Sequence, residues 1–276
     1  MSIDRLLRSA VPEGLRLELR NRVLHVVFDR PDRRNAIHRG IWDYLPGAVE
    51  AAERDDSVRA VSFSGVDAAS FSAGADIGEF DAQRIGVENA RRYSDAVRAA
   101  ELAIIGCAKP TVSFVRGWCI GGGCEIAVAC DIRIGDETAR MGITPAKLGI
   151  VYGLTSTSRL VEEVGPAWAR YLLFTAEILD AETALRAGLL QYVYPSDEAE
   201  SRWERLLERL TSGAPITQSG AKQLVARSVR GESDEDATAA ALYDASYLSE
   251  EYRIGVDAFL NKRRPDFDGV GWPDPS

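Results

Sequence analysis

The chain has 276 residues, of which 46% are hydrophobic and 27% are charged, and its formal net charge is −9. This length and composition are typical of a globular protein with one large domain, and the acidic balance disfavours general binding of nucleic acid. No apolar run is long enough to span a membrane and the N-terminus has no hydrophobic signal core, so we expect a cytoplasmic protein that binds no membrane.

The first half of the chain predicts strands that alternate with helices. Alternation of apolar and polar residues predicts a β-hairpin over residues 15–28. Helical patterns cover 87–105 and 122–130. Short apolar runs predict further strands at 59–65, 111–115 and 131–135. Short buried strands between helices indicate an α/β fold.

Beyond about residue 154 the pattern changes to successive helices. An amphipathic segment covers 197–210, and a long helical pattern over roughly 233–263 precedes a tail rich in proline and glycine. The four cysteines form no C-x-x-C pair, and three of them lie in or beside one apolar stretch. This arrangement predicts buried free thiols, as expected in a reducing compartment.

One stretch, residues 117–134, reads "GWCIGGGCEIAVACDIRI" and sets three glycines before Glu125. A tight strand-to-helix turn with Glu125 as a first-turn acid is the simplest interpretation. A phosphate loop is disfavoured, because no G-K-[ST] follows and Ile126 occupies the third glycine position of a dinucleotide motif. An anion hole for a reacting carbonyl is the third interpretation, since bare N–H groups at a helix start face outward. Residue chemistry alone favours the simple turn over the anion hole.

A second glycine-containing stretch, "SFSAGADIGEF" at 70–80, follows the strand predicted at 59–65. By itself it predicts a turn with Asp76 as a helix cap. Two such turns after two strands could each supply one N–H group to the same oxygen.

The chain resembles the crotonase superfamily, also called enoyl-CoA hydratase/isomerase, over roughly residues 13–265. The stretches that carry the resemblance are "FDRPDRRNAI", "FSAGADIGEF", "KPTVSFVRGWCIGGGCEIAVACDIRI", "LGIVYGLTSTSRLVEEVG", "AETALRAGLLQYVYP" and "GVDAFLNKRRPDF". The resemblance implies a spiral core of ββα turns and a helical C-terminal region that builds trimers, often paired into hexamers.

We divide the chain on this basis. Residues 13–195 are expected to form the acyl-CoA-binding core, and 196–265 the helical region that mediates oligomerisation and covers the pocket. Residues 1–12 and 266–276 are expected to be tails.

The resemblance also implies a site. Its oxyanion hole is formed by the backbone N–H groups of Ala75 and Gly122, which hold the thioester carbonyl of an acyl-CoA. Hydratases of the family use two glutamates, and Glu125 matches the first. The position of the second is occupied here by Pro145, which cannot exchange a proton. Tyr152 is the first candidate to replace it, although an aromatic residue in a loop more often has a packing role.

The reaction that the resemblance implies is hydration of an enoyl-CoA, or dehydration of a 3-hydroxyacyl-CoA, with Glu125 as acid/base. A crotonase-type isomerase, decarboxylase or thioesterase remains open because of Pro145. So does an acyl-CoA-binding protein without catalytic activity. We expect no cofactor apart from the coenzyme A of the substrate, and no metal, since the chain has only two histidines and no metal-binding motif.

Further residues are expected to bind the substrate or its CoA. Arg33 and Arg34 in the loop "RPDRRNAI" match the part of the chain that contacts CoA phosphates in relatives. Phe259 and Lys262 match the region near the adenine. A surface or packing role is the alternative for each. The full set of expected substrate and CoA contacts is Arg33, Arg34, Ala36, Ala73, Asp76, Ile77, Gly121, Phe259 and Lys262.

Overall fold

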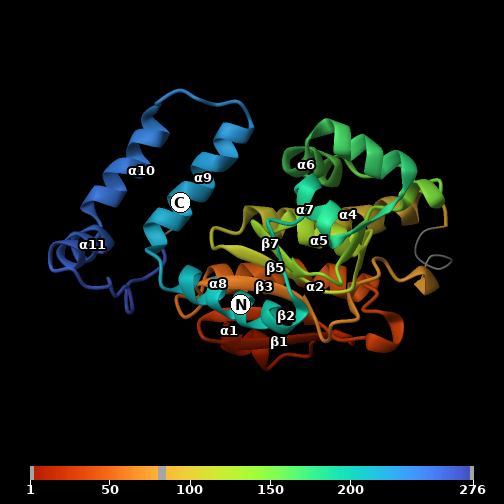
Figure 1. Cartoon of the computed structure of the whole chain (residues 1–276), viewed down its shortest axis with the longest axis horizontal. Coiled ribbons are helices and arrows are strands. Elements are labelled where there is room, and N and C mark those ends of the chain that lie inside the picture. The colour runs from red at the N-terminus through yellow and green to blue at the C-terminus, as the bar shows by residue number, and fades with distance from the viewer. Residues whose placement is uncertain (1–2, 80–84, 274–276) are drawn as a thin grey trace.

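The computed structural model describes residues 3–79 and 85–273, and its core contains two β-sheets (Figure 1). The strand order of the larger sheet is β1-β2-β3-β5-β7-β10, and that of the smaller is β4-β6-β8-β9. The strands of the larger sheet are β1 (Leu15–Arg20), β2 (Val23–Phe28), β3 (Ala60–Gly65), β5 (Thr111–Val115), β7 (Ile132–Asp136) and β10 (Tyr192–Tyr194). Those of the smaller sheet are β4 (Ser70–Ser72), β6 (Trp118–Ile120), β8 (Arg140–Gly142) and β9 (Ile178–Asp180).

The larger sheet confirms the α/β prediction and the predicted hairpin. β1 and β2 pair antiparallel from Leu15 opposite Phe28 to Arg20 opposite Val23. The pairs β2–β3, β3–β5, β5–β7 and β7–β10 are parallel. Every residue of β2, β3 and β5 is buried, because helices cover both faces of this sheet.

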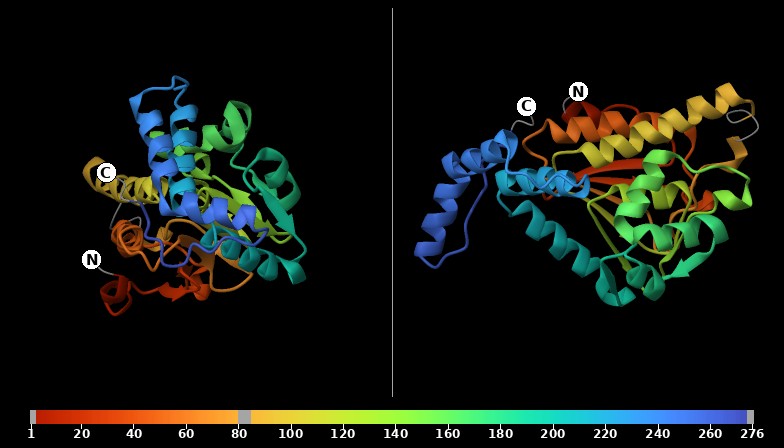
Figure 2. Two further views of the ribbon diagram at one scale, coloured as in Figure 1. Left: turned by 90° about the vertical axis from the view of Figure 1, so that its left-hand side faces the viewer. Right: turned by 90° about the horizontal axis from the view of Figure 1, so that it is seen from above.

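One face of the sheet is covered by α2 (Arg39–Glu53), α4 (Val87–Gly106) and α5 (Gly122–Ala129). α2 and α4 lie side by side (Figure 2). Trp42 of α2 is fully buried, and its indole N–H donates to the hydroxyl of Tyr93 on α4 at 3.0 Å. α8 (Ser196–Thr211) covers the other face, where Trp203 stacks on Phe114 with 4.9 Å between ring centroids.

Each strand of the smaller sheet has only three residues, too few for a periodic sequence signal, so none of the four was predicted. β4, β6 and β8 run parallel, so their carboxyl ends lie at the same edge. The segments that follow these three strands, 73–76, 121–123 and 143–153, therefore lie on one side of the molecule.

The second half of the chain is mostly helical, as predicted, and α10 and α11 project away from the core (Figures 1 and 2). α9 contacts the core through Lys222, whose ammonium lies 2.8 Å from the Asp131 carboxylate. The pattern over 233–263 forms two helices, because Ser249 ends the first and caps the second by accepting the Tyr252 N–H at 3.0 Å. The helices not yet given are α1 (Ile3–Leu7), α6 (Leu154–Thr175), α7 (Ala181–Ala187), α9 (Pro215–Val229), α10 (Ala237–Leu248) and α11 (Glu250–Leu260). Short 3₁₀ segments are η1 (Pro31–Arg33), η2 (Ile77–Glu79) and η3 (Pro145–Lys147).

Both predicted tails contact the core in the part that the structure describes. Ile3 and Leu6 of α1 are buried in the core cluster, and the Arg59 side chain donates to the backbone oxygens of Phe267 and Val270. The extreme ends of these tails, 1–2 and 274–276, lie outside the described residues. The division into core and C-terminal region, and the trimer or hexamer, stay predictions.

All four cysteines are buried and free, as predicted. None of the described helices combines the length and the apolar character needed to cross a bilayer.

Candidate active site

The two glycine-containing turns lie against each other at the ends of β4 and β6. A Cβ atom placed on Gly74 would lie only 3.1 Å from the backbone nitrogen of Gly122, and one on Gly122 would lie 3.4 Å from the backbone nitrogen of Ala75. A Cβ on Gly122 would also approach the Trp42 ring to 2.8 Å. The sequence needs glycine here because two backbones and a buried indole meet without room for a side chain.

The N–H groups of Ala75 and Gly122 are both available to a ligand. Among the described residues neither N–H donates a hydrogen bond: Ile37 bonds to the residues on either side of Ala75, and Gly122 is the first residue of α5. The first N–H groups of a helix have no acceptor within the helix. Gly121, with φ 52° and ψ −117°, makes the sharp turn that directs α5 away from β6. The two N–H groups thus lie together where the resemblance places an oxyanion hole, and that role stays a prediction.

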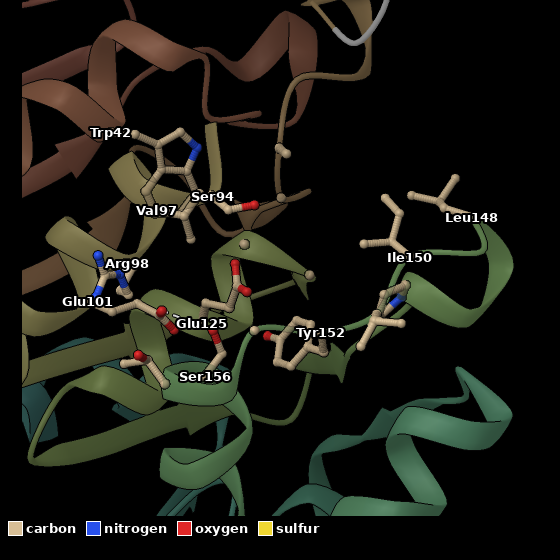
Figure 3. Close-up of a pocket in the computed structure, with 18 of the residues that line it drawn as sticks. Trp42, Ser94, Val97, Arg98, Glu101, Glu125, Leu148, Ile150, Tyr152 and Ser156 are labelled. Carbon is tan, nitrogen blue, oxygen red and sulfur yellow. Dashed lines mark hydrogen bonds between the residues drawn. The ribbon is translucent and has the colours of Figure 1, made fainter. Parts of the chain in front are cut away.

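Ala75 and Gly122 line a pocket of about 320 Å³ (Figure 3). Its lining comes from the two turns, Trp42 of α2, one side of α4, Glu125 of α5 and the segment 144–156. Ala73, Ile77 and Gly121, expected to contact the substrate, lie in this lining, as do the four residues expected to be catalytic. Apolar residues from α2, α4 and the 144–156 segment complete the lining: Trp42, Val97, Leu148, Ile150, Val151 and Leu154.

Glu125 lies in the first turn of α5, and its carboxylate points into the pocket between α4 and Tyr152 (Figure 3). The turn of glycines explains this position, because α5 begins at Gly122 and places Glu125 about one helical turn from the Gly122 N–H.

A second carboxyl group, that of Glu101 on α4, reaches the same place and was not predicted. Glu101 is 2% exposed and accepts a hydrogen bond of 2.9 Å from the Ser156 hydroxyl. Burial, and then the charge of Glu125, raise the pKa of Glu101 to about 8. At neutral pH its carboxyl group is therefore mostly protonated, beside the Glu125 carboxylate.

Tyr152 directs its hydroxyl toward Glu125 (Figure 3). The hydroxyl is buried and makes no hydrogen bond of ordinary geometry with the described residues, although Glu125 is near enough to affect its ionisation. Burial first, and the charge of Glu125 second, raise the Tyr152 pKa well above its usual value. Tyr152 is thus a neutral phenol beside the carboxylate.

Pro145 begins the short η3 segment at the edge of the pocket. None of the pocket residues contributed by 144–156 is an acid, so this part of the chain does not bring a second carboxylate to Glu125.

The remaining expected contacts lie outside this pocket lining. Asp76 accepts a hydrogen bond from Arg30 at 2.9 Å and one from the Gly78 N–H at 3.0 Å, and Arg30 also donates to the backbone oxygen of Ala36. Arg30, the third residue of "FDRPDRR", therefore links the expected ligand loop to the oxyanion turn. Its role could not be told from the sequence, where Arg33 and Arg34 carry the same charge in the same loop.

Arg33 and Arg34 have exposed side chains, but the backbone oxygen of Arg34 accepts the N–H of Ala73 and so joins their loop to the pocket turn. Phe259 is 83% exposed on α11 and Lys262 follows that helix, both away from the pocket lining. The CoA-binding roles of these four residues stay predictions.

Comparison with known proteins agrees with this fold. Residues 18–270 match the family described as enoyl-CoA hydratase/isomerase. The 2,3-dehydroadipyl-CoA hydratase of Escherichia coli K12 is 32% identical over 90% of this chain and 96% of its own, and the short-chain-enoyl-CoA hydratase of Clostridium acetobutylicum is 32% identical over 90% and 95%. The crystal structure of an enoyl-CoA hydratase/isomerase family protein from Hyphomonas neptunium superposes with a TM-score of 0.88 at 31% identity, over 92% of this chain and 97% of that one.

The chain therefore belongs to the enoyl-CoA hydratase/isomerase family, the crotonase superfamily, whose members act on acyl-CoA thioesters.

Proposed function

We propose that this protein adds water to the double bond of an enoyl-CoA, or removes it from a 3-hydroxyacyl-CoA. The observation that carries the proposal is one pocket in which two unpartnered backbone N–H groups face a carboxylate, that of Glu125. Three of the relatives most similar in sequence carry names that describe hydratases, which supports the same reaction class.

The N–H groups of Ala75 and Gly122 would donate to the thioester carbonyl oxygen. In hydration, the oxygen of water bonds to C3, a proton of that water passes to the Glu125 carboxylate, and the electron pair of the double bond moves toward the thioester oxygen. The resulting enolate carries its negative charge where the two N–H groups point. One such donor typically contributes about 10²–10³ in rate.

Addition is completed when C2 of the enolate accepts a proton. The product is then a 3-hydroxyacyl-CoA, and the reverse sequence gives dehydration. The neutral Tyr152 hydroxyl lies on the same side of the pocket as Glu125 and favours one orientation of that carboxylate.

The test is product analysis by mass spectrometry on enoyl-, 3-hydroxyacyl- and malonyl-type CoA thioesters with wild type and Glu125→Gln. We expect wild type to add or remove water and Glu125→Gln to lose about 10²–10⁴ in rate, the usual contribution of a general acid or base. Glu182→Gln, an exposed substitution on α7, is the matched control and should keep wild-type rates. Full hydration activity in Glu125→Gln contradicts the assignment.

A further inference from the structure

Addition of water across a double bond moves two protons, one from the water and one to C2. The Glu125 carboxylate accounts for the first. The segment around Pro145, from which related hydratases are expected to provide their second glutamate, contributes no acid to the pocket lining. The proton that C2 accepts therefore comes either from Glu125 itself, after it has taken the proton of water, or from another titratable group of the lining.

Three titratable side chains besides Glu125 and Tyr152 line the pocket, and all three come from α4. Asp95 and Arg98 are exposed, and their side chains form an ion pair at 3.4 Å. Glu101, one turn further along α4 than Arg98, is buried. Figure 3 shows its carboxyl group directed toward Glu125 and Ser156.

The surroundings of Glu101 keep a proton in place. Its only hydrogen-bond donor among the described side chains is the Ser156 hydroxyl, and no described cation forms an ion pair with it. Two carboxyl groups in one desolvated pocket do not ionise together, so one of them holds a proton while the other is charged. Burial selects Glu101 as the protonated member of the pair.

We propose that Glu101 is the second acid of this site and donates the proton that C2 of the enolate accepts. This inference rests on the proposed function. The Glu101 O–H bond breaks as the C2–H bond forms, and Glu101 becomes a carboxylate. Glu125 holds the proton taken from water and returns it to Glu101, so that both groups regain their starting states. Ser156 is a positioning residue, because its hydroxyl bonds to the Glu101 carboxyl.

This assignment places the second carboxyl on a different element from the one expected by resemblance. In this chain the acid comes from α4, and Ser156 in the first turns of α6 fixes it. Pro145 lies at the edge of the pocket and cannot donate a proton. An acid on α4 therefore supplies what that side of the pocket lacks.

The test compares Glu101→Gln with Glu88→Gln, an exposed glutamate on the same helix. We expect Glu101→Gln to lower kcat for hydration by about 10²–10⁴ while binding of a saturated acyl-CoA and the circular dichroism spectrum stay close to wild type. Glu88→Gln should match wild type. A Glu101→Gln variant that folds, binds and hydrates at the wild-type rate overturns the inference.

Ser156→Ala tests the same inference while it keeps the carboxyl group. Glu101 acts in its protonated form, so kcat should fall on the alkaline side as the pH passes its pKa of about 8. The Ser156 hydrogen bond lowers that pKa, and its removal should shift the alkaline fall of kcat to higher pH. A purely structural role for either residue leaves this profile in place, and an unchanged profile in Ser156→Ala therefore counts against the inference.

The outcomes separate the inference from the proposed function. If Glu125→Gln abolishes hydration and Glu101→Gln does not, hydration stands and the role of Glu101 is refuted. If wild type hydrates no enoyl-CoA, both are refuted together.

Discussion

The pocket has two walls that are built in different ways. One, here called the backbone wall, consists of the turns 73–75 and 121–122, whose N–H groups face the pocket. The other, the side-chain wall, consists of Glu101 and its neighbours on α4 together with Tyr152 and Ser156. Close packing of the two turns fixes the positions of the N–H groups in the backbone wall. In the side-chain wall, burial and the charge of Glu125 raise the pKa values of Glu101 and Tyr152.

On the proposed mechanism, the fold keeps the part of the site that binds the carbonyl, while the proton donor comes from another element. The proposed oxyanion donors depend on where two strands end, so they belong to the fold itself. Proton transfer requires only a carboxyl group at the right place with the right pKa, and several elements can supply one.

The largest effect in the backbone wall is expected from Gly122→Val. Its Cβ would approach the Trp42 ring to 2.8 Å, and Trp42 is fully buried and bonded to Tyr93, so the turn must move instead. Displacement of one oxyanion donor should lower kcat/KM by about 10²–10³ on every substrate that the enzyme accepts.

Gly47→Ala is the matched control for that measurement, since it lies on the same helix as Trp42 and its new methyl group would meet nothing within 4 Å. It should keep wild-type kinetics and melt slightly higher. A Gly122→Val enzyme with wild-type kcat/KM shows that the backbone wall is not the oxyanion hole.

A smaller effect is expected in the side-chain wall from Tyr152→Phe. The hydroxyl is neutral and contributes at most an orienting contact to Glu125, and a hydrogen bond is worth about 0.5–1.5 kcal/mol. We expect kcat to fall by about tenfold or less with little change in KM, measured by steady-state kinetics. A loss above about 10² assigns the acid role to Tyr152 and removes it from Glu101.

The smallest effect concerns stability, and it follows from the pKa of Glu101. The folded protein holds the Glu101 proton up to about pH 8, whereas the unfolded chain releases it near the ordinary 4.5. Between these values the folded state binds more protons, so its stability falls as the pH rises. Since Gln does not titrate, the melting temperature of Glu101→Gln relative to wild type should increase from pH 4.5 to 8.

Two titratable groups interact with Glu101 in that experiment: Glu125 from α5 and Tyr152 before α6. The charge of Glu125 contributes to the raised pKa. The increase in relative melting temperature should therefore be smaller when both proteins also carry Glu125→Gln. A relative melting temperature that is flat with pH contradicts the pKa assigned to Glu101.

The sequence indicated the backbone wall and Tyr152 but missed Glu101 and Ser156, and the reason is physical. Dense glycines between a strand and a helix are a local signal, and Gly122 with Glu125 three residues later could be placed from it. Glu101 lies among many charged residues of a long helix, where nothing local separates it from the exposed Glu88. Its burial depends on how α4 packs against α5 and α6, which a single sequence does not reveal.

The same reasoning applies to the fold. The hairpin and the buried strands β3, β5 and β7 agree with the predicted ranges to within one residue, because apolar runs mark them directly. The break at Ser249 was missed because both helices share one continuous helical pattern, and only the cap geometry separates them.

The most direct test of the central claim is to run the wild-type enzyme on an enoyl-CoA in ¹⁸O-labelled water and to analyse the product by mass spectrometry. The account predicts a 3-hydroxyacyl-CoA that carries one labelled oxygen at C3, and loss of that product in Glu125→Gln. Free coenzyme A with a labelled carboxylic acid, or a shifted double bond without label, contradicts it and shows that the oxyanion hole serves another reaction.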